Sequence, residues 1–467
     1  MKINGIEITG MTNDSRRVQP GWAFFAVDGA RQRGTDYIPA AESAGASIII
    51  TDENYKGKSF KVPDIRQFLA ETAAQFFKPL PENIVAVTGT KGKSSIVHFV
   101  RYVLEKMGKD AASIGSIGLT HRGVSAGFAD STTTPDPIVL CDVMHKLKAQ
   151  GCDYIAMEAS SQGLAQSRLN ALPIKVAAFT NLFRDHISEF EHKDMEDYFA
   201  AKKKLFTEVL PADGVAVLNA DIPEYAELAA LAAPRRVISY GKNGADIKLL
   251  DAVCDARSQR ITAAIFGKIY EYELKAAGGF QSMNSLCAIG MLVGLGFDAA
   301  DIVRAIEGAP AATGRMQFVG SPVKDGGVYV DYAYTPDSLE NVLTFARGFC
   351  KGRLMSLFGA GGERDPARRF GCGEVAERLA DVVYITDDNP RNEDPAKIRE
   401  QIAGKCPKGI VIADGRGAAI RRAVSDMKDG DILIISGKGH EDYQLVGSVK
   451  LHFSDFEEAA KAIAENI

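Results

Sequence analysis

Short apolar runs separated by polar or glycine-rich stretches recur along the whole chain. The run at 84–87 predicts a buried strand, and the apolar spacing over 96–104 predicts the helix that follows it. Further apolar runs end in polar clusters, which is typical of strands in the same kind of sheet; they are 154–157, 176–179, 328–331, 354–358, 382–385 and 431–435. This repetition predicts an α/β fold with doubly wound, mostly parallel sheets.

The first part of the chain shows the same pattern on a smaller scale. Apolar runs at 23–27 and 46–50 flank a helix-like stretch at 37–44, and the proline-bearing segment 77–81 is a candidate linker. A length of 467 residues suggests three domains at about 150 residues each. We therefore expect a small N-terminal α/β domain (1–80), a central phosphate-loop domain (81–312) and a C-terminal Rossmann-like domain (313–467).

Composition narrows the class of protein. A net charge of -5 with 25% charged residues gives no sign of a nucleic-acid surface. The seven cysteines are scattered and form no C-x-x-C pair, which favours reduced thiols in a cytosol over a disulfide framework or a zinc site. No signal peptide or membrane span is predicted. We expect a cytoplasmic protein with small-molecule ligands, no nucleic-acid partner and no membrane insertion.

The segment 88–94, Thr-Gly-Thr-Lys-Gly-Lys-Ser, lies between the first central strand and its helix. Such a loop directs backbone N–H groups and a helix N-terminus at one point, where Lys93 adds a charge and Ser94 a hydroxyl suited to Mg²⁺. The usual phosphate-loop spacing would place the first glycine at Val87, whereas this chain has Gly89. On spacing alone, a turn that binds nothing remains an alternative.

Polar side chains follow the next central strands. Glu158 comes directly after an apolar run, where a phosphate-loop domain often holds a hard cation, although a surface end-cap would look the same. His186 follows the next strand, and a local hydrogen-bond partner is its simpler interpretation. The lysine triplet 202–204 resembles a solvated helix face, and the sequence alone selects none of the three. Clusters after the C-terminal strands, at 359–362, 386–389 and 437–441, predict a second binding edge.

Taken together, these motifs resemble those of the Mur ligases, ATP-dependent amide ligases of peptidoglycan precursor synthesis. The resemblance extends from Asp-Ser-Arg (14–16) to Gly-Lys-Gly-His-Glu (437–441), and the late glycine of the phosphate loop is the family's own spacing. The motifs between them appear in family order: Thr-Thr-Pro (133–135), Glu-Ala-Ser-Ser (158–161), Phe-Thr-Asn-Leu (179–182), Arg-Asp-His (184–186), Asp-Tyr-Ala (331–333) and Asp-Asn-Pro-Arg (388–391).

The resemblance implies two cofactors, ATP and Mg²⁺. By family position the ATP-binding residues are Gly89, Thr90, Lys91, Gly92, Lys93, Ser94, Ser95, Asn284, Arg315 and Asp331. The implied metal ligands are Ser94, Glu158, His186 and Lys202, the last as a carbamate formed with CO₂. The implied catalytic residues are Lys93, Glu158, His186 and carbamylated Lys202. Because the nucleotide contacts come from the central and C-terminal domains, domain closure is expected to complete the site.

The resemblance also implies the substrates, a UDP-N-acetylmuramoyl dipeptide and an amino acid, bound by a monomer. The implied sugar-nucleotide contacts are Ser15, Arg16, Thr133, Thr134, Ser160 and Arg168. The implied amino-acid contacts are Arg364, Asp388, Asn389, Arg391, Gly437 and Glu441. An arginine in Asp-Asn-Pro-Arg can form a two-pronged pair with a distal carboxylate, which meso-diaminopimelate has and L-lysine lacks. We therefore expect meso-diaminopimelate as the added amino acid.

Other functions remain open at this point. The chain could catalyse the same ligase reaction with L-lysine or another amino acid, or it could be a non-catalytic nucleotide-binding paralogue. A folylpolyglutamate synthetase would fit the loop but is not expected to carry Asp-Asn-Pro-Arg. This chain also departs from the family pattern at Arg33, Gln162, Gln281, Tyr334 and Phe370.

Overall fold

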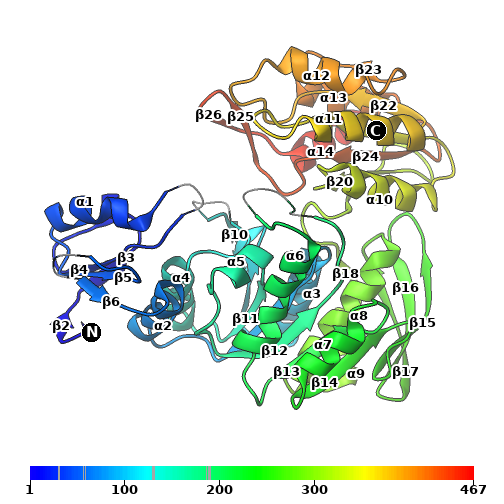
Figure 1. Cartoon of the computed structure of the whole chain (residues 1–467). Helices are drawn as coiled ribbons and strands as arrows, with labels where there is room; N and C mark the ends of the chain where they lie inside the picture. Colours follow the sequence, from blue (N-terminus) through cyan, green and yellow to red (C-terminus); the bar gives the residue numbers. More distant parts are fainter. Residues whose placement is uncertain are drawn as a thin grey trace. The chain divides into compact units, whose positions relative to one another are not determined.

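The computed structural model describes residues 1–29, 32–55, 57, 59–128, 132–185, 187 and 191–466 (Figure 1). Its contacts form two compact units. The first is Met1–Lys248 with Ile265–Gly267 and Asn284–Ala305, and the second is Leu249–Ala264 with Lys268–Met283 and Ile306–Ile467. Both are α/β structures, as the sequence predicts. The expected domain boundaries at 80/81 and 312/313 stay a prediction. Among the described residues, no helix combines the length and the apolar character needed to span a membrane.

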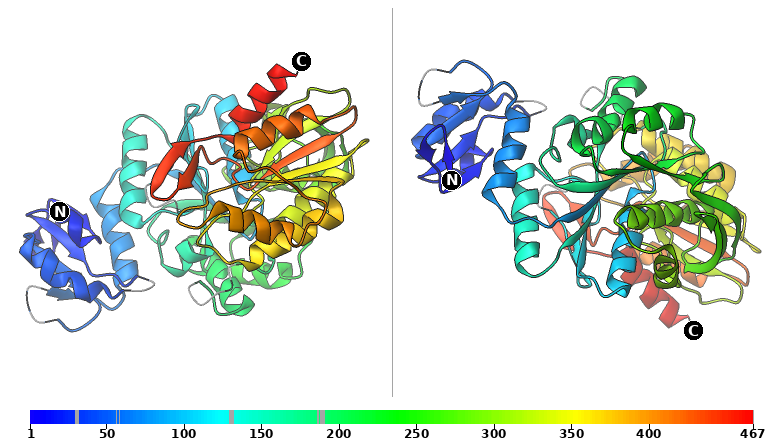
Figure 2. Two further views of the ribbon diagram at one scale, coloured as in Figure 1. Left: turned by 90° about the horizontal axis from the view of Figure 1, so that it is seen from above. Right: turned by 90° about the horizontal axis from the view of Figure 1, so that it is seen from below.

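The first unit begins with a hairpin, β1 (Lys2–Ile3) and β2 (Ile6–Glu7), and a small parallel sheet. Its strand order is β3 (Gly10–Thr12), β4 (Trp22–Phe25), β5 (Ile48–Thr51) and β6 (Ser59–Lys61). Successive side chains point to opposite faces: Phe24 packs with Ile38 of α1 (Ile38–Ser43), whereas Phe25 lies in the core that includes Leu69 of α2 (Ile65–Phe76). Both faces are therefore covered, and α2 lies beside α4 (Pro137–Ala149) (Figure 2).

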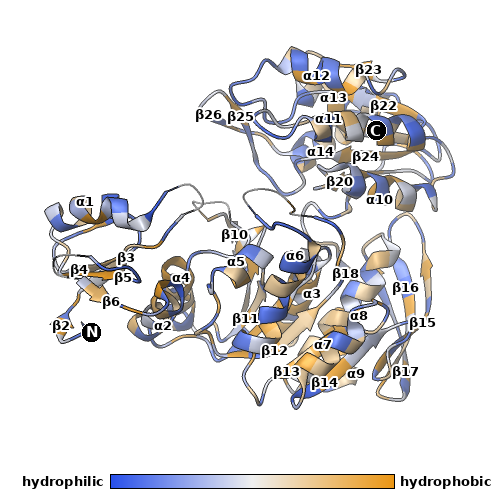
Figure 3. Cartoon of the chain, in the orientation of Figure 1, coloured by the Kyte–Doolittle hydropathy of each residue, from blue (hydrophilic) through white to orange (hydrophobic). Residues whose placement is uncertain are grey.

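A larger sheet follows, with β7 (Asn83–Thr88) in its interior. The order of its strands up to β14 is β10 (Val124–Ala126), β9 (Gly118–His121), β8 (Ala111–Gly115), β11 (Tyr154–Glu158), β7, β12 (Ile174–Phe179), β13 (Val215–Asn219) and β14 (Arg236–Gly241). The strands from β8 to β14 are parallel, and β9 and β10 are antiparallel edge strands. The parallel strands are almost continuously hydrophobic, because helices cover both faces of a parallel sheet (Figure 3).

The position of β7 explains where a ligand can bind. From β7 the chain passes through α3 (Lys93–Lys106) to β8 on one side, and later enters β12 on the other. The order therefore reverses at β7, and such a switch point leaves a crevice at the carboxyl ends of the strands. The first unit also contains α5 (Ser161–Ala165), α6 (Met195–Lys204) and α7 (Tyr225–Ala232), and most of α8 (Gly279–Gly294) and α9 (Ala299–Ile306). The helix α6 ends at Lys204, and the chain continues as a π-helical turn, Leu205–Val209.

The second unit contains most of β15 (Ile247–Cys254) and β16 (Gln259–Ile265), together with β17 (Lys268–Lys275) and β18 (Ala309–Pro310), which pair in parallel. The helices α8 and α9 lie between β17 and β18 in sequence, but their residues Asn284–Ala305 belong to the first unit.

A six-stranded sheet forms the rest of the second unit. Its order is β19 (Gln317–Gly320), β20 (Gly327–Asp331), β24 (Ile432–Ser436), β21 (Leu354–Phe358), β22 (Val382–Ile385) and β23 (Ile410–Val411), and only β19 is antiparallel. One face packs on α10 (Pro336–Arg347), α11 (Ala367–Leu379) and α12 (Pro395–Ala403), the other on α13 (Arg416–Ser425) and α14 (Asp455–Glu465). A hairpin, β25 (Tyr443–Val446) and β26 (Val449–His452), follows β24.

Candidate active site

The phosphate loop between β7 and α3 needs glycine at two positions. Gly89 has φ +134° and Gly92 has φ +92°, both in the region that side chains avoid. A Cβ on Gly89 would overlap Thr180 Oγ1, and one on Gly92 would overlap Asn284 Oδ1. Val87, where the common loop motif has glycine, is instead a buried strand residue paired with Glu158. The late glycine thus marks where this loop leaves its strand.

The end of β12 braces the loop from the side. Thr180 Oγ1 donates to the Lys91 carbonyl at 2.7 Å, and the Lys91 N–H donates to Asn181 Oδ1 at 2.9 Å. The Thr90 N–H donates to the Asn181 carbonyl at 2.9 Å. The loop is therefore held before any ligand arrives, which lowers the entropy lost on binding.

Two lysines converge on the carbonyl of Gly89. Lys93 Nζ donates to it at 2.8 Å and to the Thr90 carbonyl at 2.9 Å, and Lys202 Nζ donates to it at 2.9 Å. Lys202 is 1% exposed and lies 4.3 Å from the centre of the Tyr198 ring. Burial, and then the charge of Lys93, lower the pKa of Lys202 well below its usual value.

The other two lysines of the triplet have ordinary surface partners. Lys203 pairs with Glu227 at 2.7 Å, and Lys204 pairs with Glu208 at 3.3 Å. The structure therefore separates Lys202 from its neighbours, a distinction that the sequence pattern did not make.

Glu158 lies at the end of β11 and is 1% exposed. Its Oε1 accepts from the Ser116 N–H at 2.9 Å and its Oε2 from the Ser116 hydroxyl at 3.2 Å. Ser94, in the first turn of α3, is also buried. Among the described residues, Thr88 Oγ1 is a buried hydroxyl without a hydrogen-bond partner. Carboxylate and hydroxyl oxygens are the donor types that Mg²⁺ prefers, so these residues fit that ion. His186 lies outside the described residues.

Four of the predicted sugar-nucleotide residues lie near Glu158. Thr134 Oγ1 donates to the Glu158 carbonyl at 2.9 Å and accepts from the Ser160 N–H at 3.0 Å. Arg168 Nη1 donates to the Thr134 carbonyl at 2.5 Å. Thr133 Oγ1 lies 3.0 Å from the Ser116 hydroxyl. The sequence motifs around 133 and 158 therefore form one continuous edge of the first unit.

Ser15 and Arg16 lie in a 3₁₀ turn of the N-terminal sheet region. The Arg16 side chain is 87% exposed and pairs with Asp14 at 2.8 Å. Close by in sequence, Asn13 Nδ2 donates to Asp136 Oδ2 at 2.8 Å, which links this region to the start of α4. The side chain of Arg16 is thus open to a ligand.

In the second unit, Asp331 organises the loops after β20 and β24. Its Oδ2 accepts from the Met316 N–H at 2.7 Å and its Oδ1 from the Ala333 N–H at 2.9 Å, while its carbonyl accepts from the Gly437 N–H at 3.2 Å. The Arg315 guanidinium lies 4.9 Å from the centre of the Tyr332 ring. Arg315 and Asp331, predicted as nucleotide contacts, are therefore close together.

Five of the predicted amino-acid contacts lie on two facing loops of the same unit, after β22 and β24. Asn389 Nδ2 donates to Glu441 Oε2 at 3.0 Å. Asp388 Oδ2 is the atom that a Cβ on Gly437 would meet at 3.0 Å. Arg391 Nη1 donates to the Gly362 carbonyl at 2.6 Å.

Arg364 and Arg391 flank Gly361, since a Cβ there would meet Arg391 Nη1 at 3.1 Å and Arg364 Cγ at 3.5 Å. Arg364 is exposed and Arg391 is half-buried. Burial raises the pKa of the Glu441 carboxyl; Lys438 lowers it and Asp388 raises it again, so the pKa lies above its usual value.

Sequence reasoning missed two charged groups behind these loops. Lys438 is fully buried, and Arg416 pairs with Asp455 at 2.7 Å with both side chains 0% exposed. Arg416 also donates to the carbonyls of Asp387 at 3.3 Å and Ser436 at 2.8 Å. The only signal in the sequence was the lysine inside Gly-Lys-Gly-His-Glu (437–441), which could have been read as a site residue.

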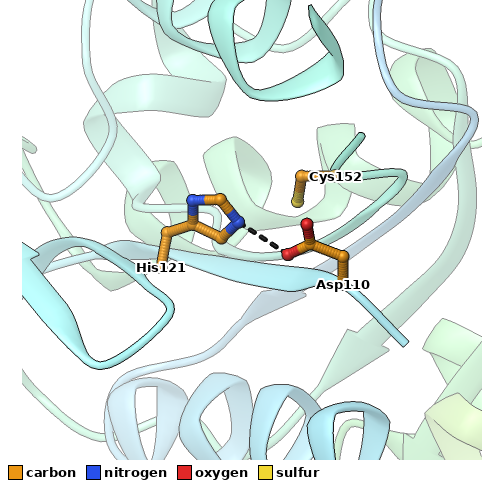
Figure 4. A group of neighbouring side chains, drawn as sticks. All are labelled: Asp110, His121 and Cys152. Carbon is orange, nitrogen blue, oxygen red and sulfur yellow. Dashed lines mark hydrogen bonds and ion pairs between the residues drawn. The ribbon is translucent and has the colours of Figure 1, made fainter. Parts of the chain in front are cut away.

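A group of metal-ligand side chains, Asp110, His121 and Cys152, lies at the opposite, amino ends of β8 and β11 (Figure 4). Asp110 is already engaged, by His121 at 2.7 Å and by Arg122 at 2.5 Å. Burial raises the pKa of the Asp110 carboxyl, but these hydrogen bonds outweigh it and the net pKa is lowered. Burial raises the pKa of the Cys152 thiol to about 11, which disfavours the thiolate that metals bind. We interpret this group as an ion-pair network.

Comparison with known proteins places these features in a family. Three family models match the chain: "Mur ligase family, catalytic domain" over 7–77, "Mur ligase middle domain" over 87–292 and "Mur ligase, glutamate ligase domain" over 314–439.

Two curated relatives cover nearly the whole chain, and both are named UDP-N-acetylmuramoyl-L-alanyl-D-glutamate--2,6-diaminopimelate ligase. The one from Mesorhizobium japonicum is 42% identical and covers 98% of this chain and 96% of its own. The one from Rhizobium meliloti is 43% identical, with 98% and 94% covered.

Solved structures agree on the fold. A structure of a ligase of the same name aligns with a TM-score of 0.73 and 29% identity, covering 98% of this chain and 95% of that one. The MurF ligase of Thermotoga maritima in complex with ADP aligns with a TM-score of 0.64 at 19% identity, covering 99% of both chains. The second likeness concerns the fold alone.

Proposed function

Since this chain belongs to the Mur ligase family, we propose that it is an ATP-dependent ligase that adds meso-2,6-diaminopimelate to UDP-N-acetylmuramoyl-L-alanyl-D-glutamate. The observation that carries the choice of amino acid is the charge pattern on the two loops after β22 and β24. Arg391 offers a guanidinium, and Glu441 with Asn389 offers a carboxylate and an amide. A side chain that ends in both a carboxylate and an ammonium complements this pattern.

The reaction begins with ATP bound at the phosphate loop. The N–H groups at the start of α3 and the Lys93 ammonium neutralise the phosphates, because both present positive charge at one point. The substrate carboxylate attacks the γ-phosphorus, so that an acyl phosphate forms and ADP leaves. The amino group of diaminopimelate then attacks the acyl carbon, an amide forms, and phosphate departs. Positioning and charge neutralisation supply most of the catalysis.

We propose that Glu158, Ser94, His186 and Lys202 hold Mg²⁺, which supplies charge neutralisation at the transferring phosphoryl group. Lys202 would do so as a carbamate: its neutral amine attacks CO₂, an N–C bond forms and one proton is released to water. The lowered pKa of Lys202 supports this, since only the neutral amine is a nucleophile.

The remaining site residues are assigned to the three substrates. We propose that Ser15, Arg16, Thr133, Thr134, Ser160 and Arg168 bind the UDP-sugar dipeptide. Asn284, Arg315 and Asp331 would bind the nucleotide, and Arg364, Asp388 and Gly437 would complete the amino-acid site. The free state of all seven cysteines supports a reducing compartment, so we propose a cytoplasmic enzyme that acts as a monomer.

The deciding experiment measures phosphate release from ATP with UDP-N-acetylmuramoyl-L-alanyl-D-glutamate and, in parallel, meso-diaminopimelate, L-lysine or L-ornithine. We expect release with meso-diaminopimelate. Release with L-lysine alone would overturn the choice of amino acid, and no release with any of the three would favour a nucleotide-binding paralogue.

The variant Arg391→Met tests whether Arg391 binds the distal carboxylate of meso-diaminopimelate. It should lower kcat/KM for meso-diaminopimelate by about 100-fold without changing the KM for ATP, because a desolvated charge pair is lost. The matched control is Arg378→Met, since Arg378 is an exposed arginine of the same unit that pairs with Glu340. This control should leave kcat/KM unchanged.

A further inference from the structure

Lys438 is a fully buried cation inside the proposed amino-acid site, and the function described above leaves it without a role. It lies in the loop directly after β24 and is 0% exposed. Its Nζ donates to Asn389 Oδ1 at 3.0 Å and lies 3.3 Å from Asp388 Oδ1 and 3.4 Å from Glu441 Oε2. A buried ammonium is stable only when nearby groups compensate its charge, and here two carboxylates do so.

Lys438 changes the net charge of four charged side chains that line the proposed amino-acid site. Asp388 and Glu441 contribute two negative charges, and Lys438 and Arg391 contribute two positive charges. The side chains of Asp388 and Glu441 are 9% and 17% exposed, so water screens these charges weakly. The loops therefore present a balanced set of charges to an incoming side chain.

We propose that Lys438 is a positioning residue that makes the site select a zwitterionic side-chain end, one ammonium and one carboxylate, over a bare ammonium. This inference rests on the function proposed above. With Lys438 present, one of the two carboxylates is already neutralised. One carboxylate then remains for the ligand's ammonium, and Arg391 remains for its carboxylate. Without Lys438, two carboxylates face one guanidinium, so a bare ammonium gains and a ligand carboxylate is repelled.

If Lys438 had only a structural role, its loss would affect the amino-acid substrates in a different way. Lys438 also holds Asn389, whose Oδ1 accepts from the Leu445 N–H at 2.9 Å and so connects the loop to β25. If Lys438 only supported this connection, its loss would impair all amino-acid substrates equally. A charge role changes the preference between substrates, which can be measured separately.

The test replaces Lys438 by glutamine, which keeps a donor for Asn389 Oδ1 and removes the charge. For Lys438→Gln we expect the ratio of kcat/KM for meso-diaminopimelate to kcat/KM for L-lysine to fall by about tenfold or more, with the KM for ATP unchanged. Lys450→Gln is the matched control: Lys438 Nζ lies 5.6 Å from the centre of the Tyr443 ring, and Lys450 Nζ lies 4.0 Å from the same ring but is exposed. It should leave the ratio unchanged.

Variants that restore the charge balance distinguish a charge role of Lys438 from a structural one. The double variant Lys438→Gln/Asp388→Asn removes one charge of each sign and should recover most of the ratio. Asp388→Asn alone leaves an excess of positive charge, so it should lower L-lysine use more than meso-diaminopimelate use. Equal losses for both amino acids in Lys438→Gln would overturn the inference.

If Lys438→Gln does not fold, Asp388→Asn tests the inference instead. The inference then requires that Asp388→Asn lower kcat/KM for L-lysine more than kcat/KM for meso-diaminopimelate. If the unmodified enzyme releases no phosphate with any amino acid, the proposed function fails. If the unmodified enzyme prefers meso-diaminopimelate and Lys438→Gln keeps that preference, only this inference fails.

Discussion

The side-chain nitrogen of Lys202 donates a 2.9 Å hydrogen bond to the carbonyl of Gly89, although 113 residues separate them in the chain. This bond joins α6 to the phosphate loop and brings the buried amine of Lys202 beside Lys93, whose own ammonium binds the same carbonyl. The repulsion between the two cations and the loss of hydration both favour a neutral Lys202. A neutral amine at this position is the chemical precondition for the proposed carbamate.

We predict that Lys202→Ala lowers kcat by about 100-fold or more, because the metal ligand that we propose beside the transferring phosphoryl group is lost. A short carboxylic acid in the buffer should restore part of the activity by supplying the missing carboxylate. Phosphate release measures both effects. Lys203→Ala is the matched control, since Lys203 pairs with Glu227 on the surface, and it should retain full activity. Full activity of Lys202→Ala would contradict the carbamate.

The two glycines Gly89 and Gly108 allow the backbone cost of a positive φ to be separated from a steric clash. Gly108→Ala adds a Cβ at φ +74° with nothing within 4 Å, so it should cost only about 1–2 kcal/mol of backbone strain and leave kcat unchanged. In Gly89→Ala the Cβ also meets Thr180 Oγ1, which should add about 1–3 kcal/mol and displace the loop. Denaturant unfolding and phosphate release measure the two effects, and equal behaviour of the variants would refute the steric argument.

Much of this architecture could be predicted from local patterns. The strand and helix around the phosphate loop are confirmed as β7 and α3, because the apolar alternation and the glycine-rich loop are encoded by neighbouring residues. Glu158 is confirmed to lie at the carboxyl end of its strand, as the last residue of β11, and it is buried there. Family motifs then indicated that Gly89 was the relevant glycine, and its positive φ explains why.

What could not be predicted depends on contacts between distant segments. Lys202 differs from Lys203 only in what surrounds it, and those surroundings come from β7 and the phosphate loop. Lys438 lies within a motif, but its partners Asp388 and Asn389 are about 50 residues away along the chain. Helical or strand periodicity carries no information on such pairings, because it reports which face of an element is buried and not what covers it.

The buried pair Arg416–Asp455 should stabilise the second unit, because removing either partner leaves the other charge buried and unpaired. Arg416→Met leaves the Asp455 carboxylate buried and uncompensated, which should cost about 3–5 kcal/mol. Arg421→Met is the control: Arg421 is half-exposed and pairs with Glu458, so its loss should cost less than about 1 kcal/mol.

The shift of the denaturant midpoint measures both variants. The double variant Arg416→Met/Asp455→Leu should recover most of the loss, since no buried charge remains. A midpoint in Arg416→Met that equals that of Arg421→Met would contradict this account.

Binding of meso-diaminopimelate should weaken as the pH falls, and earlier than an ordinary glutamate would require. Burial raises the pKa of Glu441, and this increase together with that from Asp388 exceeds the lowering by Lys438. Protonation removes the negative charge that we propose for the ligand's ammonium, so the KM for meso-diaminopimelate rises as the pH drops through the raised pKa. The titratable or polar groups that interact with this carboxyl are Asp388, Lys438, Asn389, Tyr443, Tyr332 and Arg416.

The measurement is the KM for meso-diaminopimelate between about pH 8 and about pH 5, with the KM for ATP followed over the same range as a control. Glu441→Gln should have a higher KM at neutral pH and a flat profile, because the titrating group is gone. A profile that persists unchanged in Glu441→Gln would assign the titration to another group. A KM that stays constant until the ordinary pKa of glutamate would show that burial of Glu441 does not govern binding.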